Sequence, residues 1–170
     1  MSQLQYKGFD LFMDADNHEW SLHQWHKSCE NQTGFHCSTN IIKAMNVEHI
    51  CHIALVQPEE PRIIDKSTIV YNKMKLLHLI TWLDEDDQAL KEFVQKVTDS
   101  LAGLVPNPVI TATAYPVIAD IWNIAEMTAS KAISSMDSKS IEEKASAYTR
   151  AYYESIQQFH NWVVERKFKS

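Results

Sequence analysis

One run of apolar residues near the C-terminus constrains the fold more than any other part of the chain. Its members follow one another at steps of four or three residues: Ile141, Ala145, Tyr148, Tyr152, Ile156, Phe159 and Val163. Such a stripe lies on one face of an α-helix, because the helix has about 3.6 residues per turn. Ser140 and Glu143 fit the capping box that begins such a helix. The pattern predicts a long amphipathic helix that starts after Ser140.

Three further helices are predicted upstream of this one. Asp65 or Ser67 caps a strongly apolar segment that ends near residue 83. The acidic run from Asp84 to Asp87 favours the start of a second helix, since negative charge stabilises a helix N-terminus. Asn107 with Pro108 begins a third, which Pro116 either kinks or restarts. Four helices between residues 65 and 167, joined by short turns, are typical of an antiparallel bundle.

The first 60 residues are less regular. Apolar residues alternate loosely on both sides of a polar break at 14–18, which favours a β-hairpin over 6–27. Ser38 or Thr39 is expected to cap a short helix. The segment 49–56 fits either a helix or a strand, and Pro58 and Pro61 are expected to end it.

We therefore expect a mainly α protein, a helical bundle of about five helices with a small N-terminal β-hairpin. The alternative is an α+β fold with a short sheet from residues 6–27 and 49–56. Three glycines and five prolines in 170 residues favour long helices over many tight turns. A chain of this length fits a single domain, 1–170, in which a His/Cys-rich part, 1–60, packs on a four-helix body, 65–167.

Charge and composition narrow the class of partner. The formal net charge is −6, and the basic residues cluster only at 166–169, so nucleic acid is an unlikely partner. No run reaches the roughly 18–20 apolar residues that span a bilayer, and the N-terminus lacks the pattern of a signal peptide. Three cysteines are an odd number, which indicates free thiols. We expect a cytoplasmic protein with no membrane segment.

Residues that could bind a metal or act as a nucleophile are concentrated in one stretch, 17–52. This stretch holds six of the eight histidines and all three cysteines. His23 and His26, and likewise His49 and His52, are spaced three apart and would share a face on a helix. Four imidazoles from two elements could hold zinc or another transition metal. If His23 and His26 lie on a strand, however, their side chains point to opposite faces and cannot bind the same metal ion.

A second hypothesis concerns Cys37, which precedes the predicted helix start at 38–39. A helix N-terminus and a nearby histidine would lower the pKa of the thiol. Gln32 could supply an oxyanion-stabilising amide, and His160 is the distant candidate for a general base. The plainer interpretation is a small buried residue at a loop–helix junction.

The last helix carries five aromatic residues that could line a pocket: Tyr148, Tyr152, Tyr153, Phe159 and Trp162. A stripe at this spacing is more often core, and we interpret it so. No Gly-rich phosphate loop and no His-Glu-x-x-His motif is found. The sequence thus favours a non-enzymatic helical binding or regulatory module that acts on a protein or small-molecule partner, such as an adaptor, inhibitor or immunity-type factor. The alternatives are a metal-dependent protein or enzyme using the four histidines, and a cysteine-nucleophile enzyme.

Overall fold

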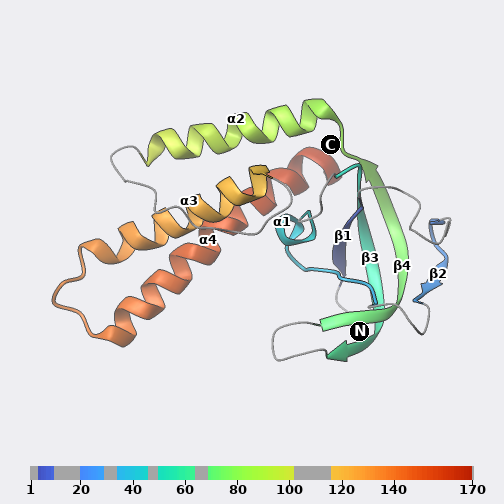
Figure 1. Ribbon diagram of the computed structural model, residues 1–170, viewed down its shortest axis with the longest axis horizontal. Helices are drawn as coiled ribbons and strands as arrows, with labels where there is room; N and C mark the ends of the chain where they lie inside the picture. Colours follow the sequence, from blue (N-terminus) through green and yellow to red (C-terminus); the bar gives the residue numbers. More distant parts are fainter. Residues whose placement is uncertain are drawn as a thin grey trace. The chain divides into compact units, whose positions relative to one another are not determined.

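The computed structural model describes residues 4–9, 20–28, 34–45, 50–63, 69–101 and 116–169. The chain divides into two compact units, Met1–Leu83 and Asp84–Ser170. Figure 1 shows a curved sheet in the first unit and helices in the second. None of the described helices is long and apolar enough to cross a membrane.

The first unit is built on a four-stranded antiparallel sheet in the order β1-β3-β4-β2. Its strands are β1 (Gln5–Phe9), β2 (Trp25–Lys27), β3 (His52–Ile63) and β4 (Ile69–Thr81). A long hairpin of β3 and β4 forms its centre, and short strands flank it on either side (Figure 1). The expected mainly α bundle is therefore wrong, and the protein is α+β. The expected N-terminal β-hairpin over 6–27 is wrong too, because β1 pairs with β3 and β2 with β4, at opposite edges of the sheet.

The helix predicted over 65–83 is wrong, because this segment contains strand β4. Leu55 and Val56 pair with His78 and Leu76, so Leu77 is an extra residue on β4 and forms a bulge. Before a bulge the even-numbered residues of a strand can face the core, and after it the odd-numbered ones do. Leu76 is fully buried, and Leu79, three residues later, packs against the same cluster. The step of three residues from Leu76 to Leu79 across the bulge resembles the spacing of apolar residues on a helix.

The segment 49–56, which the sequence left open between helix and strand, contains the start of β3. The expectation that Pro58 and Pro61 end this segment is also wrong, since β3 continues to Ile63. In the described residues β1 pairs with β3 only as far as Val56. Beyond that point one side of β3 has no described neighbouring strand, and a proline is tolerated on an edge because no ladder donor is required there.

One part of the first unit's core is a buried cluster of Phe9, Trp20, Phe35, Ala54, Val56, Met74 and Leu76. Ile53, the neighbour of Ala54 on β3, is fully buried as well, so side chains are buried on both faces of the sheet. The Trp20 ring lies 5.3 Å from that of Phe9 and 5.5 Å from that of Phe35, in tilted and edge-on arrangements that aromatic pairs favour.

The short helix α1 (Ile41–Ala44) packs close to β1. Its N-cap is Asn40 rather than the predicted Ser38 or Thr39, and the Asn40 side chain accepts a hydrogen bond from the Ile42 N–H at 2.9 Å. A Cβ at Gly8 of β1 would overlap the carbonyl oxygen of Ala44. Glycine is therefore required where strand and helix meet.

The second unit consists of α2 (Asp84–Ser100), α3 (Pro116–Ser134) and α4 (Ile141–Phe168). The predicted start of α2 at Asp84 is confirmed, as is the capping box of α4, in which Ser140 and Glu143 exchange hydrogen bonds of 3.0 and 3.2 Å. The predicted helix start at 107–108 lies outside the described residues, and Pro116 begins the described helix.

Helices α3 and α4 form an antiparallel hairpin, and α2 packs on it within the same unit (Figure 1). Phe93 of α2 stacks on Trp162 at 5.3 Å and meets Phe159 edge-on at 5.4 Å. The predicted four-helix body at 65–167 thus has three helices in its described residues. That the two units form a single domain, 1–170, stays a prediction.

Candidate functional site

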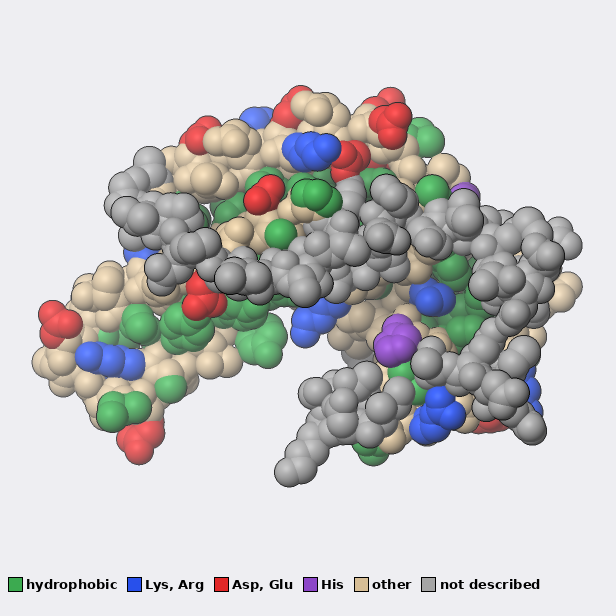
Figure 2. All heavy atoms as spheres, viewed as in Figure 1, with side chains coloured by type: hydrophobic (Ala, Val, Ile, Leu, Met, Phe, Trp, Pro, Cys, Tyr) green, Lys and Arg blue, Asp and Glu red, His purple; other side chains and the backbone are tan. Residues whose placement is uncertain are grey.

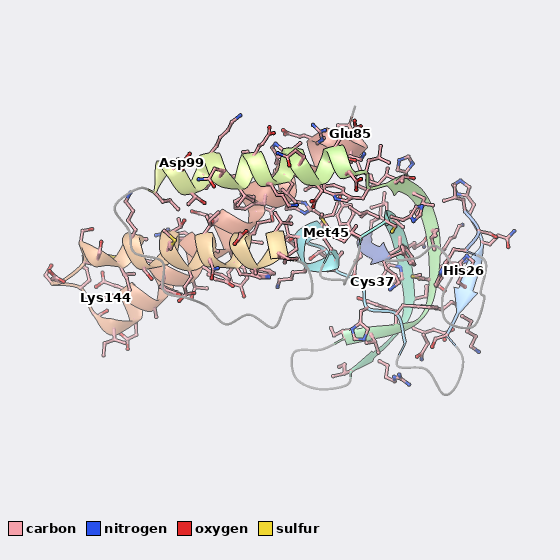
Figure 3. The ribbon with its side chains drawn as sticks, turned by 45° about the horizontal axis from the view of Figure 1, so that its top comes forward. His26, Cys37, Met45, Glu85, Asp99 and Lys144 are labelled. Atoms are coloured by element: carbon pink, nitrogen blue, oxygen red, sulfur yellow. The ribbon has the colours of Figure 1, made fainter. Side chains whose placement is uncertain are left out.

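Of the predicted metal-ligating residues, His26 lies on β2 with its side chain 4% exposed (Figure 3). Its ring centroid is 4.8 Å from that of Trp20. Nε2 lies 2.9 Å from the carbonyl oxygen of Ser21 and 3.2 Å from its backbone nitrogen. With a proton on Nε2 the ring donates to the carbonyl, and without one it accepts from the N–H. These contacts make His26 part of the first unit's packing.

His23 does not share a face with His26. It occupies an exposed turn before β2 with φ of 63°, and its N–H donates to the carbonyl oxygen of Leu76 at 2.7 Å. The exposed turn position of His23 and the buried strand position of His26 separate the two side chains. The structure does not bring this pair together.

His52 lies far from His26 along the sheet. It pairs with Thr81, whereas His26 pairs with Met74, seven residues away on the same strand. At ~3.3 Å per residue this corresponds to roughly 20 Å. His49 lies outside the described residues, and within the described ranges no three His, Cys, Asp or Glu side chains are grouped to hold a metal. A site for zinc or another transition metal at His23, His26, His49 and His52 stays a prediction.

Cys37 packs against the aromatic core of the first unit (Figure 3). Burial raises the pKa of its thiol to about 11, and the positive charge of Lys7 offsets only part of that increase. A thiol of this kind carries a proton near neutral pH, whereas a nucleophile needs the thiolate. Gln32 lies outside the described residues, and His160 belongs to the other unit. The thiol environment weighs against the cysteine-nucleophile alternative.

A different set of side chains surrounds a cavity on the α3–α4 hairpin. The cavity has a volume of about 260 Å³ and is lined by Glu126, Tyr148, Thr149, Tyr152 and Tyr153. Glu126 comes from α3, and the other four come from α4 in two pairs spaced four residues apart. Residues at that spacing stand one above the other on a helix, so they form two adjacent rows. Figure 2 shows hydrophobic side chains along this hairpin with acidic side chains among them.

The aromatic rings of this site are ordered against one another. Tyr152 is nearly parallel to Trp122 of α3 on one side and to Tyr148 on the other, each at 6.5 Å between centroids and 12° between planes. Tyr153 meets Tyr152 edge-on at 5.7 Å. We call Trp122 and the five cavity-lining residues the aromatic groove.

Burial and the neighbouring Glu126 carboxylate both affect the tyrosines of the aromatic groove. Burial, a hydrogen bond to Glu126 and the charge of that carboxylate together raise the pKa of Tyr148 to about 12. The pKa of Tyr152 is raised too, first by burial and then by Glu126. Burial is the largest cause of both shifts, and the negative charge of Glu126 adds to each.

The interpretation of the α4 aromatics as core holds for only part of the stripe. Phe159 is fully buried, but Tyr148 and Tyr152 are half-buried and Tyr153 is 56% exposed. Two features of the sequence indicate this difference: the outer positions carry tyrosine, whose hydroxyl stays near water, and Glu126 is the single acidic residue within 121–136.

No protein-family model, curated protein or solved structure matches the chain.

Proposed function

We propose that this protein is a non-enzymatic binding or regulatory module for a protein or small-molecule partner, and that the aromatic groove is its binding surface. The observation that carries the proposal is the gathering of three tyrosines and one carboxylate at an open cavity, with Trp122 stacked on one of those tyrosines, Tyr152. Ligand sites are concave and mostly apolar, with a few polar groups that fix orientation. Tyrosine and tryptophan are enriched at such surfaces because they combine a large apolar area with a polar tip.

The same residues support binding rather than catalysis. Tyr148, with a pKa raised to about 12, is a poor general base near neutral pH. Glu126 is the single carboxylate that lines the cavity, whereas acid–base chemistry on carboxylates usually employs two. Metal-dependent or cysteine-dependent catalysis in the first unit stays an alternative, and no grouping among the described residues favours it.

We also place this module in the cytoplasm. The support is that Cys37 and Cys51 are free thiols in the described part of the chain, as is usual in a reducing compartment.

The test uses three ring-bearing probes that differ in charge: benzyltrimethylammonium, benzyl alcohol and benzoate. Each is titrated into the full chain while the side-chain NMR resonances of Trp122 and the groove tyrosines are followed. We expect at least one probe to shift these resonances in a saturable manner. We expect Tyr153→Ala to weaken that binding about tenfold, because an exposed aromatic wall is removed.

Gln157→Ala is the matched control, since Gln157 is exposed on α4 and does not line the cavity. This variant should bind like the unaltered chain. The proposal is wrong if all three probes leave the groove resonances in place, or if Tyr153→Ala binds as tightly as Gln157→Ala.

A further inference from the structure

We infer that the aromatic groove recognises a trimethylammonium headgroup, held against the faces of its tyrosines with Glu126 as the counter-charge. The inference rests on the proposed function, since it assigns a ligand class to the same surface. The headgroup can belong to a free small molecule or to a trimethylated lysine side chain, which offer the groove the same chemistry.

The arrangement of the rings suits a cation. The face of an aromatic ring is electronegative and attracts a cation that lies within about 6 Å of its centroid. Tyr152 has neighbouring ring centroids at 5.7 Å (Tyr153) and at 6.5 Å (Tyr148). A cation over one ring is therefore within range of a second. Several rings around one cation are the arrangement by which proteins bind quaternary ammonium groups.

The charge of the groove and of its surroundings also favours a cation. Glu126 lines the cavity from α3, across from the tyrosines of α4. Residues 84–170 hold nine basic and thirteen acidic side chains, a formal net charge of −4 for the second unit. Lys144 lies one turn before Tyr148, near the turn of the hairpin (Figure 3), and does not line the cavity. The field of the groove attracts a cation and repels an anion.

The groove suits a quaternary ammonium better than other cations. A primary ammonium has three N–H donors and is strongly hydrated, so it needs several acceptors when it leaves water. The cavity-lining side chains offer the Glu126 carboxylate, which already accepts a hydrogen bond from Tyr148, and hydroxyl groups. A metal ion would need three or more ligands. A trimethylammonium group has no N–H and presents methyl groups, which suit aromatic walls.

The size of the cavity fits a headgroup. Its volume of about 260 Å³ falls just below the ~300–1,000 Å³ typical of sites that enclose a whole drug-sized ligand. Because Tyr153 is 56% exposed, the rest of a longer ligand can leave the groove toward solvent.

The experiment compares choline with 3,3-dimethylbutan-1-ol, its uncharged isostere in which carbon replaces the quaternary nitrogen. Both are titrated into the full chain and followed by NMR and calorimetry. We expect choline to bind at the aromatic groove about tenfold or more tightly than the isostere. A peptide with trimethyl-lysine, set against the same peptide with unmodified lysine, tests the second source. Tighter binding of either trimethylated ligand than of its counterpart supports the inference.

Three variants locate the interaction. Glu126→Gln should weaken choline binding several-fold and leave the isostere unaffected, because it removes charge and keeps shape. Glu165→Gln removes the same charge from an exposed site on α4 outside the groove and should change neither. Tyr152→Phe keeps the ring face and should retain choline binding. If Glu126→Gln fails to fold, Tyr153→Ala alters an exposed position and serves in its place.

The outcomes separate this inference from the proposed function. If neither trimethylated ligand binds more tightly than its counterpart and the isostere still binds the groove, the groove is an apolar site, so the inference is wrong and the proposed function stands. If choline binds equally to Glu126→Gln, or binds with the groove resonances unmoved, the inference is also wrong. If neither these ligands nor the three ring-bearing probes bind the groove, both fail.

Discussion

Lys167 Nζ lies 2.6 Å from one carboxylate oxygen of Asp86, whose side chain is 3% exposed. Arg166 Nε lies 3.0 Å from the other oxygen. The acidic first turn of α2 and the basic last turn of α4 therefore bind each other within the second unit. Part of the basic cluster at 166–169 thus serves internal pairing.

Asp86→Asn should destabilise the protein by about 2–3 kcal/mol, because it leaves two cationic groups beside a site that no longer neutralises them. This loss of stability is smaller than the roughly 3–5 kcal/mol typical of a broken buried ion pair. The reason is that the Arg166 side chain is 39% exposed, so water screens its pairing with Asp86. Urea unfolding followed by circular dichroism measures the loss. Glu92→Gln, on the exposed face of α2, is the control and should change stability by less than about 0.5 kcal/mol. Equal effects of the two substitutions would contradict the pairing.

Gly8→Ala should destabilise the first unit by about 1–3 kcal/mol, because the added methyl group meets the backbone of Ala44 and β1 or α1 has to move. Thermal unfolding measures the change. Thr39→Ala adds no such contact at an exposed position and should stay close to the unaltered protein. An unchanged midpoint for Gly8→Ala would show that β1 and α1 are not packed as described.

The thiol of Cys37 should react slowly with alkylating reagents until the pH is well above 9. In a variant with Cys29→Ser and Cys51→Ser, the alkylation rate should rise with an apparent pKa near about 11. An apparent pKa at or below the ordinary thiol value of 9.0 would instead restore the nucleophile hypothesis.

The same burial has a consequence for stability. The folded-state pKa of Cys37 is raised above its ordinary value of 9.0, so the neutral thiol favours the folded state. This contribution is fully present below pH 9 and is lost as the pH rises toward about 11. Cys37→Ala should therefore show less destabilisation between those two pH values than the unaltered chain.

Tyr148 should ionise only near pH 12, above the ordinary tyrosine value of 10.0. Ultraviolet difference titration of the full chain against Tyr148→Phe isolates its phenol. Burial is the first cause of the raised pKa, and Glu126 adds to it, so Glu126→Gln should lower the pKa of Tyr148 without returning it to the ordinary value of 10.0. An unchanged titration in Glu126→Gln would separate the carboxylate from Tyr148 and weaken the argument for the groove.

The second unit could be predicted because its helices are specified locally. The Ser140–Glu143 capping box and the acidic start at Asp84 are sequence-local features, and each marks the observed helix start. Strand β4 could not be predicted in this manner. Its single extra residue, Leu77, depends on pairing with β3, and the resulting change of parity gives the apolar residues a nearly helical spacing.

Only part of the aromatic groove could be predicted from the sequence. The stripe through Tyr148 and Tyr152 predicts a helix face but not which turns of it another helix covers. That depends on α2, whose Phe93 packs on Phe159 and Trp162. The pairing of Glu126 with Tyr148 depends on the α3–α4 hairpin, a contact between distant residues that spacing along one helix does not reveal.

The two prolines of β3 also bear on the behaviour of the protein at high concentration. Past Val56 one side of this strand is not paired by β1 in the described residues. An unpaired strand edge is a template on which a strand of another molecule can add. Pro58 and Pro61 carry no N–H and their rings obstruct close approach. Pro58 and Pro61, the predicted end of this segment, thus leave the described edge of β3 without two of the N–H donors that an added strand would need.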